Sequence, residues 1–521
     1  MKTALIGLDG ACFTVLDHLM SEGFMPRLSA LCERSARRIL KSTPLPITPQ
    51  AWTTLATGRS MGHHGISDFV RVEFKSNTPV LRFNSSSDIH CEPLWLRASR
   101  FEKTVTLLNY IGTAPPPRID GHVLPGFVPA RHLRRSTHPQ DLFEKLEGLG
   151  YINVRALGLD LDIEKRALQE MPAEQWARWI DLHSDRERAW FESLQYLLKV
   201  EPSDLTMIVF DGADKIQHLA YRYLDPRLIP ENPSPWEIDI IERCRNYFRR
   251  LDDYIGEIVE MIGDDGRVFI ASDHGFTRTH QVVYINKWLH DQGLLHWRDE
   301  APKDELASIV VHRLTRHLDQ FDWENTKAFA LTPSSNGIFI NNVPENEYHG
   351  FREELIEKLH TIKGPHGEAI VTEIKKREDW FAGPYMDRAP DLTLTLNDFG
   401  FVSVLNAHDV VVPRKEPAGT HHPDGIFLAL GAGIEPGTEG RALEMVDIAP
   451  VLLHSLDLSI PSCYEGELPM DLYDSDYLMR NSPRIVEEST SIGSRDHSGE
   501  QMSEDDQEIL IERLKTLGYI E

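Results

Sequence analysis

The sequence predicts an α/β fold with a doubly wound, mostly parallel central sheet, helices on both faces, and helical or irregular insertions that cap it. Two observations predict this class. Several short aliphatic and β-branched runs end abruptly in an Asp followed by Gly or His, which is typical of buried parallel strands. Amphipathic stretches such as residues 239–262 separate these runs, and this alternation favours helices packed on both faces of a parallel sheet.

The apolar runs place acidic side chains and histidines at their ends. In chain order, residues 4–8 precede Asp9, residues 205–210 precede Asp211, residues 267–272 precede Asp273 and His274, and residues 425–430 follow the segment Gly419-Thr420-His421. Ligands of doubly wound sheets bind beyond the carboxyl ends of the strands. We therefore expect the Asp and His side chains at these ends to converge on one site.

The chain is predicted to form one catalytic domain over residues 1–475. Two stretches interrupt the series of strands with charged and helix-forming residues, at about 136–200 and 290–385, and we interpret them as insertions that wall the site. Residues 476–502, rich in Ser, Glu and Gly, are expected to be a flexible polar segment. Residues 503–521 are expected to form a last helix, because their apolar residues fall on one face.

Composition excludes several classes of protein. The 521 residues are 41% hydrophobic and 26% charged, with a mean hydropathy of -0.34, which suits a globular protein with a sizeable core. The net charge of -26 opposes binding of extended nucleic acid, and no run of residues is long and apolar enough for a membrane span. Five scattered cysteines without a C-x-x-C pair favour a reducing compartment, so we expect a cytoplasmic protein.

Thr48 stands out as a candidate nucleophile. It precedes Pro49 and a helix-compatible run that ends at Gly58, which predicts Thr48 as the N-cap and Pro49 as the first helical residue. A hydroxyl at the positive end of a helix dipole is well placed to meet an anionic phosphate. A purely structural cap is the alternative, since capping Thr residues are common.

Three further motifs carry candidate metal ligands. Asp214 and His218 are four residues apart, so a helix would place both on one face, although such pairs are often solvated surface. Asp273 and His274 are adjacent at a strand end, where a simple turn is the alternative, and the Gly419–Gly425 segment carries two histidines. With Asp9, these motifs supply a set of oxygen and nitrogen ligands that suits two divalent ions. Such an ion pair can clamp both oxygens of a displacement at phosphorus.

The order of these motifs resembles the type I phosphodiesterase/nucleotide pyrophosphatase branch of the alkaline phosphatase superfamily. The resemblance covers most of the chain, from residue 4 to about 460. The matching segments are Gly7-Leu8-Asp9-Gly10, Thr48 through Thr57-Gly58 to His64-Gly65-Ile66, Asp214 to His218, Ser272-Asp273-His274-Gly275-Phe276, and Gly419-Thr420-His421 followed by Gly425-Ile426-Phe427.

This resemblance implies a metal-dependent phosphohydrolase, and a phosphodiesterase before a phosphomonoesterase or phosphomutase. Thr48 would be the nucleophile that forms a covalent phosphothreonine. One ion would be held by Asp214, His218 and His421, and the other by Asp9, Asp273 and His274. The ions would be Zn²⁺, which suits mixed His/Asp ligands, or Mn²⁺. The substrate would be a small phosphodiester or nucleotide-like molecule. A degenerate ligand-binding protein is the alternative from another class, and the complete ligand set opposes it.

One departure from the family bears on specificity. Nucleotide pyrophosphatases carry an Asn three residues after the nucleophile, where this chain has Ala51, so nucleotide specificity does not follow from the resemblance. No cysteine stands in a C-x-P-x-R setting, which opposes a formylglycine sulfatase. His64, Trp52 and Asn109 are candidates for residues behind the ligands or in the wall of the site, with packing as the alternative for each.

Overall fold

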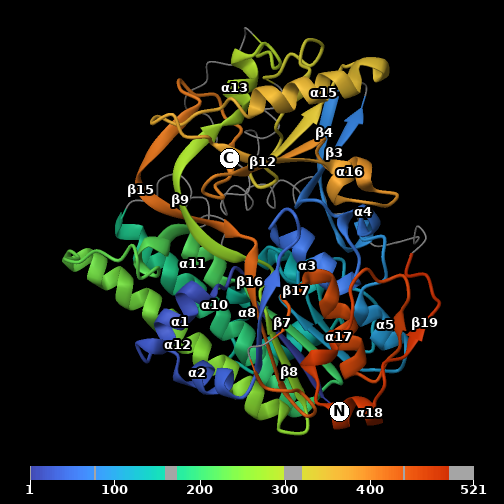
Figure 1. Cartoon of the computed structure of the whole chain (residues 1–521). Helices are drawn as coiled ribbons and strands as arrows, with labels where there is room; N and C mark the ends of the chain where they lie inside the picture. The colour runs from blue at the N-terminus through green and yellow to red at the C-terminus, as the bar shows by residue number, and fades with distance from the viewer. Residues whose placement is uncertain (1, 76–77, 159–172, 299–319, 438–439, 492–521) are drawn as a thin grey trace.

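An eight-stranded sheet lies at the centre of the larger lobe of the molecule (Figure 1). The computed structural model describes residues 2–75, 78–158, 173–298, 320–437 and 440–491. The strand order is β17-β2-β16-β8-β1-β7-β5-β6, in which β8, β1, β7, β5 and β6 run parallel and β16 is antiparallel to both its neighbours. The strands are β1 (Thr3–Leu8), β2 (Ala36–Lys41), β5 (Val105–Leu108), β6 (Gly121–Leu124), β7 (Leu205–Phe210), β8 (Arg267–Ala271), β16 (Asp424–Gly431) and β17 (Leu443–Glu444).

Side chains alternate between two apolar layers on either side of this sheet. In β1, Ile6 and Leu8 belong to one buried cluster while Leu5 belongs to the other. The first cluster is completed by α1 (Phe13–Ser21), α2 (Pro26–Glu33), α10 (Ala173–Val200) and α12 (Pro235–Ile262). The second contains α3 (Thr48–Thr57), α5 (Leu94–Arg100) and α17 (Ile448–Ser455). Because both faces are covered, the central strands are apolar throughout, as parallel sheets require.

A smaller lobe lies above the sheet in Figure 1 and is built on a four-stranded sheet of order β10-β11-β13-β12. Its strands are β10 (Ala328–Phe329), β11 (Gly337–Ile340), β12 (Val371–Lys376) and β13 (Leu392–Leu396), with α13 (Ile285–Asp291), α15 (Glu345–Leu359) and α16 (Arg377–Trp380) beside them. The antiparallel pair β9 (Gly275–Tyr284) and β15 (Val411–His422) rises from the larger lobe toward it. The lower ends of this pair therefore reach the carboxyl edge of the main sheet.

The predicted fold class is confirmed, and the four predicted strands are β1, β7, β8 and β16. The two insertions differ from the expectation of helical or irregular caps. Residues 290–385 contribute three strands of the second sheet, and α10, in the other insertion, packs into the main core against α12. Such pairings depend on contacts between distant segments, which local patterns do not reveal.

Residues 476–491 also differ from their prediction. Residues 476–491, expected to begin a flexible polar segment, are built into the main body. The helix α18 (Ser475–Arg480) is followed by β19 (Ile485–Val486), which pairs with β18 (Ile460–Pro461). The buried guanidinium of Arg97 lies 2.7 Å from the Glu488 carboxylate and holds this segment in place. The helix predicted over residues 503–521, and residues 492–502 before it, lie outside the described residues.

Candidate active site

The candidate site lies at the carboxyl ends of three neighbouring parallel strands. Asp9 directly follows β1, and Asp273 with His274 follows β8. Asp214 and His218 lie on α11 (Gly212–Ala220), the helix that begins after β7. His421 comes from the lower end of β15, where its register partner is Phe276 of β9. The sheet order β8-β1-β7 and the β9–β15 pair thus bring together all six predicted metal ligands, from four segments of the chain.

Asp9, Asp273 and His274 form one compact group. The Nε2 atom of His274 lies 3.5 Å from Oδ1 of Asp9 and 3.3 Å from Oδ2 of Asp273. All three side chains are buried, and one ligand atom from each lies within 4.8 Å of the others. The group matches the ligand set that the resemblance implies for one ion.

The second group contains Asp214, His218 and His421. Oδ1 of Asp214 lies 3.3 Å from Nε2 of His218 and 3.2 Å from Nε2 of His421, and the two imidazole nitrogens lie 3.0 Å apart. His274 lies between the two groups, because its Nε2 is also 3.9 Å from Asp214 Oδ1 and its ring stacks on that of His421 with 3.5 Å between centroids. The two groups are therefore adjacent, and both lie against the His274 imidazole.

Backbone carbonyls orient two of the imidazoles. His421 is bonded through Nδ1 to the carbonyl oxygen of Pro46 at 2.6 Å, and His274 through Nδ1 to that of Gly275 at 3.0 Å. A carbonyl only accepts, so each Nδ1 carries the proton. Each Nε2 then presents its lone pair to the neighbouring carboxylates. This tautomer is the one that a metal-binding histidine adopts when a second partner fixes its ring.

The buried carboxyl groups of the two groups would be stabilised by a bound positive charge. Burial raises the pKa of Asp9 well above its usual range, helped by the nearby Asp273 and Asp214 carboxylates. Burial also raises the pKa of Asp273, and it lowers the pKa of His421 to about 3. For Asp214, burial raises the pKa, but positive charge on His218 and His421 outweighs it and holds the pKa well below the usual range.

Unpartnered polar atoms show that these residues fit metal ions. Oδ1 of Asp9, Oδ1 of Asp214, Oδ2 of Asp273 and Nε2 of His274 are buried and have no hydrogen-bond partner among the described residues. Leaving four such atoms unsatisfied would be costly, since each has lost its contacts with water. Divalent cations would satisfy all four, and mixed carboxylate and imidazole ligands suit Zn²⁺ and Mn²⁺.

Thr48 lies at the start of α3, where it is 1% exposed. The carbonyl that orients His421 belongs to Pro46, two residues before Thr48, which ties the start of this helix to the metal-binding groups. The predicted N-cap is wrong by one position. Ile47 has the extended backbone of a cap, and its carbonyl accepts the first helical hydrogen bond, from the Ala51 amide at 2.9 Å. Thr48 is thus the first helical residue, and its hydroxyl is not needed as a cap.

Neighbouring groups hold the ligand-bearing loops in place. The Gly10 amide donates to Oδ1 of Asp273 at 3.1 Å, and Gln217 donates from Nε2 to the Gly10 carbonyl at 2.8 Å. Gly10 has a φ of +67°, and a Cβ there would lie 2.9 Å from the ring of Phe276, so both conformation and space require glycine. The Ser42 hydroxyl donates to the Asp273 carbonyl at 2.6 Å. These contacts link the loops after β1, β2 and β8.

The three secondary candidates take packing or supporting positions. His64 accepts the Ile66 amide at Nδ1, so its Nε2 donates to Thr54 Oγ1 at 3.0 Å. Trp52 is fully buried and packs its ring edge-on against Tyr110 with centroids 5.5 Å apart. Asn109 is also fully buried and contributes to a separate ionic network. The hydrogen bonds of His64 thus lead to α3, and those of Asn109 lead to the end of β7.

That network was missed by sequence reasoning. Arg186 of α10 pairs through Nη1 with Asp211, at the end of β7, and donates from Nη2 to Asn109 at 3.2 Å. Oε1 of the adjacent Glu187 accepts the Gly212 amide at 2.7 Å. Burial raises the pKa of Glu187 to about 8. The network fixes the first turn of α11, which carries Asp214. Of its members, Asn109 was a candidate from the sequence and Asp211 had a signal in its place after an apolar run, whereas Arg186 and Glu187 had none.

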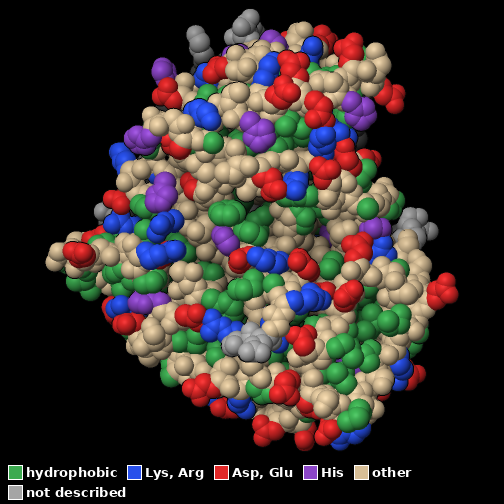
Figure 2. All heavy atoms as spheres, viewed as in Figure 1, with side chains coloured by type: hydrophobic (Ala, Val, Ile, Leu, Met, Phe, Trp, Pro, Cys, Tyr) green, Lys and Arg blue, Asp and Glu red, His purple; other side chains and the backbone are tan. Residues whose placement is uncertain are grey.

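Charged side chains of both signs cover the face of the molecule drawn in Figure 2. Figure 2 shows acidic and basic side chains interspersed on this face, which is hollowed between the two lobes, and not one large basic patch. Within the described ranges, none of the helices has the length and apolar character to cross a bilayer.

Comparison with solved structures shows the fold. Phosphonoacetate hydrolase from Sinorhizobium meliloti 1021, in complex with phosphonoformate, aligns with a TM-score of 0.52 and 16% identity over 88% of this chain and 95% of its own. Murine ectonucleotide pyrophosphatase/phosphodiesterase 5 aligns with a TM-score of 0.52 and 13% identity over 91% of this chain and 100% of its own. An inactive threonine-to-alanine variant of the murine protein in complex with AMP aligns equally well.

Comparison of sequences shows the family. No curated protein matches the chain by sequence. The family model described as type I phosphodiesterase/nucleotide pyrophosphatase matches residues 3–424, which include all six predicted ligands and Thr48. The chain therefore belongs to the type I phosphodiesterase/nucleotide pyrophosphatase family and is a hydrolase that acts on phosphoric ester bonds.

Proposed function

We propose that the protein is a metal-dependent phosphodiesterase that works through a covalent phosphothreonine at Thr48. One observation carries the proposal. Two adjacent groups of carboxylates and imidazoles, buried except for the partly exposed His218, lie at the end of the sheet and contain four buried ligand atoms without a hydrogen-bond partner among the described residues. In support, the family's description names phosphodiesterases, and the murine neighbour is titled as inactive when one threonine is replaced by alanine.

The two groups would hold one divalent ion each. Asp9, Asp273 and His274 would hold the first, and Asp214, His218 and His421 the second. Zn²⁺ suits the mixed ligands best, and Mn²⁺ is also compatible with them. When bound, such ions supply positive charge to the phosphate and lower the pKa of a hydroxyl beside them.

The residues of this chain would then carry out a double displacement. The Thr48 hydroxyl loses its proton and its oxygen attacks phosphorus, which forms a new P–O bond. The P–O bond to the leaving alcohol breaks, and that oxygen takes up a proton. A water molecule then attacks the phosphothreonine, which releases the phosphomonoester and returns the hydroxyl. The α3 N-terminus would favour this chemistry, because the start of a helix carries partial positive charge.

Charge favours a diester over a monoester. Two divalent ions would exceed the charge of the three aspartates of the site by one, which matches the single negative charge of a diester. The buried cations nearby are already engaged, since Arg186 pairs with Asp211 and Asn109, and Lys215 lies 3.5 Å from Asp211. A monoester carries a second negative charge and would need another cation.

The substrate class is a small phosphorylated molecule. Structural neighbours are titled in complex with phosphonoacetate and with AMP, and both ligands are small and anionic. The proposed compartment is the cytoplasm. The five cysteines carry free thiols, and Cys12, Cys91 and Cys244 are buried, so the described fold does not rely on disulfides.

Hydrolysis of two model esters tests the proposal. The native protein, loaded with Zn²⁺ or with Mn²⁺, is compared on bis-p-nitrophenyl phosphate and on p-nitrophenyl phosphate. We expect preferential hydrolysis of the diester, and its loss in Thr48→Ala with metal content retained. Thr361→Ala, at an exposed threonine, is the matched control and should keep full activity.

Other outcomes of this experiment would favour a different function. A preference for the monoester would favour a phosphomonoesterase. Bound metal without turnover of either ester would favour a phosphomutase or an enzyme specific for a substrate unlike both. A native protein that binds neither ion would contradict the proposal and favour a degenerate ligand-binding protein.

A further inference from the structure

A short loop between β13 and β14 (Val402–Ser403) carries two phenylalanines to the lower end of β15. The ring of Phe401 lies edge-on to the ring of His421, with 5.0 Å between centroids. The ring of Phe399 lies edge-on to that of His422, with 4.7 Å between centroids. His421 is one of the proposed metal ligands, and His422 follows it. The loop therefore places two aromatic rings beside the segment that supplies a metal ligand.

Hydrogen bonds from both strands of the β9–β15 pair fix this loop. Oδ2 of Asp398 accepts from the Thr279 hydroxyl at 2.7 Å and from the His280 amide at 2.9 Å, and both of these residues belong to β9. The Thr420 hydroxyl of β15 donates to the Phe399 carbonyl at 3.1 Å. The position of Phe399 is thus set on both sides by the strands below it.

The backbone of Phe399 is strained, and its side chain is exposed. Its φ of +58° lies in the left-handed region, which glycine and asparagine adopt readily and a bulky side chain does not. The side chain is 37% exposed, so packing within the described protein covers only part of the ring. The stability of the fold does not explain a large apolar side chain at such a position. Strained residues of this kind cluster at ligand-binding sites.

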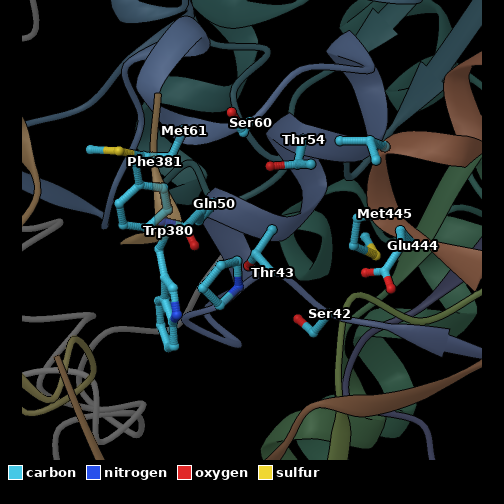
Figure 3. A pocket seen from close by; sticks show the side chains of 12 residues that line it. Ser42, Thr43, Gln50, Thr54, Ser60, Met61, Trp380, Phe381, Glu444 and Met445 are labelled. Atoms are coloured by element: carbon cyan, nitrogen blue, oxygen red, sulfur yellow. The ribbon is translucent and has the colours of Figure 1, made fainter. Parts of the chain in front are cut away.

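A cavity on the flank of α3, also between the two lobes, has a different character (Figure 3). Its lining combines the hydroxyls of Ser42 and Thr43, the amide of Gln50, and the apolar side chains of Met61 and Phe381. Donors, acceptors and apolar groups all occur there, so this lining does not select one kind of ligand. Phe399 offers a single kind of surface, which is a flat apolar ring.

We infer that Phe399, together with Phe401, binds a flat apolar arm of the substrate. The inference rests on the proposed function, because a phosphoryl group bound at the metal-binding groups would lie beside His421, within one ring of Phe401. An aryl arm would stack on an exposed phenylalanine and bury apolar surface of both partners. A methyl arm has no such surface. The arm is either the one that departs or the one that stays on phosphorus, and both have the same chemistry at the ring.

Binding of two phosphonates tests the inference without turnover. Phenylphosphonate and methylphosphonate share the phosphonate group and differ only in the arm, and each is titrated calorimetrically into the metal-loaded native protein. We expect phenylphosphonate to bind about fivefold or more tightly. Phe399→Asn should bring the two affinities within about twofold, because the ring is lost. Phe101→Asn, at an exposed phenylalanine after α5, is the matched control and should keep the preference.

Metal content and unfolding distinguish binding from packing. Asparagine tolerates the left-handed backbone, so Phe399→Asn should keep its metal and an unfolding midpoint near or above the native value. Loss of the phenyl preference together with loss of metal would assign the ring to packing and overturn the inference. Equal native affinities for the two phosphonates, or a preference that survives in Phe399→Asn, would also overturn it. If neither phosphonate binds, the proposed function fails along with the inference.

Two diesters with the same leaving group identify the arm. Phenyl p-nitrophenyl phosphate and methyl p-nitrophenyl phosphate both release p-nitrophenol. If the ring binds the retained arm, Phe399→Asn should lower kcat/KM for the phenyl diester at least about fivefold more than for the methyl diester. If it binds the departing arm, kcat/KM should fall equally for both. Either result retains the site, and an unchanged kcat/KM for both diesters would overturn the inference.

Discussion

Oδ1 of Asp214 lies 3.2 Å from Nε2 of His421, although the two residues come from distant parts of the chain. The helix α11 presents the carboxylate after β7, and the strand β15 brings the imidazole down from the smaller lobe. Neither residue is a distinctive motif alone. Their convergence beside His218 and His274 forms a candidate site for a cation.

Asp214→Asn is expected to remove one of the two proposed ions. The amide has no negative charge to offer, and Asp214 lies at the centre of its group, in contact with both histidines. Elemental analysis after gel filtration should show about one ion per chain in place of two, with diester hydrolysis reduced at least about a hundredfold. Asp253→Asn, at an exposed aspartate of α12, should keep both ions. Unchanged stoichiometry in Asp214→Asn would refute the site assignment.

Gly7→Ala is expected to destabilise the fold. A Cβ at this position of β1 would lie 2.6 Å from the Trp52 ring and 2.9 Å from Val209, in a region without free space. We expect the free energy of unfolding in urea to fall by about 1 to 3 kcal/mol, as for other overpacked cores. Gly148→Ala is the matched control, because nothing lies within 4 Å of its added Cβ; its effect should stay within about 0.5 kcal/mol. Equal effects of both changes would contradict this packing.

Arg186→Met is expected to weaken both stability and metal affinity. It leaves the buried Asp211 carboxylate without its arginine, a loss of about 3 to 5 kcal/mol of unfolding free energy. Asp211 precedes α11, so the position of Asp214 should suffer as well. Arg188→Met, at an exposed arginine of the same helix, should change stability by less than about 1 kcal/mol.

A compensating change separates the ionic role of Arg186 from simple packing. The double variant Arg186→Met/Asp211→Asn should regain part of the lost stability, since no unpaired charge remains. If the double variant is as unstable as the sum of both single variants, the ion pair does not couple these positions.

The free energy of unfolding should depend on pH through the titration of Asp68. Burial raises the pKa of this carboxyl to about 6, despite hydrogen bonds from the Thr332 and Ser334 hydroxyls. The folded state thus binds the proton more tightly than the unfolded state, whose value is near 3.8. The resulting stabilisation is complete below pH 4 and is lost as the pH rises through about 6. By pH 8 the loss amounts to about 3 kcal/mol.

Urea unfolding of native protein and Asp68→Asn from pH 4 to pH 8 measures this contribution. The difference in unfolding free energy, native minus variant, should fall by about 3 kcal/mol over this range, because the amide does not titrate. Asp120→Asn, at an exposed position, should show a constant difference. A constant difference for Asp68→Asn would mean that its carboxyl does not titrate abnormally.

Much of the fold and the site follows from local sequence. Buried parallel strands are apolar throughout, so β1, β7 and β8 are visible as runs, and the polar residues at their ends mark the carboxyl edge where Asp9 and Asp273 lie. The spacing of Asp214 and His218 likewise predicts their shared helical face.

The remainder depends on contacts between distant segments. The second sheet pairs β11 and β12 with β13, which lies beyond the predicted insertion, and no local period specifies such a pairing. Arg186 is an ordinary polar residue in its helix until α10 packs on the sheet and buries it. The position of His274 between the two ligand groups could not be predicted from the sequence. Its adjacency to Asp273 assigns it only to the group that contains Asp273.

The stereochemistry of diester hydrolysis at phosphorus tests the central claim most directly. A phosphorothioate diester of p-nitrophenol, chiral at phosphorus, is hydrolysed in ¹⁸O-labelled water and the configuration of the thiophosphate product is determined. Each in-line displacement inverts phosphorus, so attack by Thr48 followed by attack of water predicts overall retention. Overall inversion would show that water attacks the substrate directly, and would contradict the phosphothreonine intermediate.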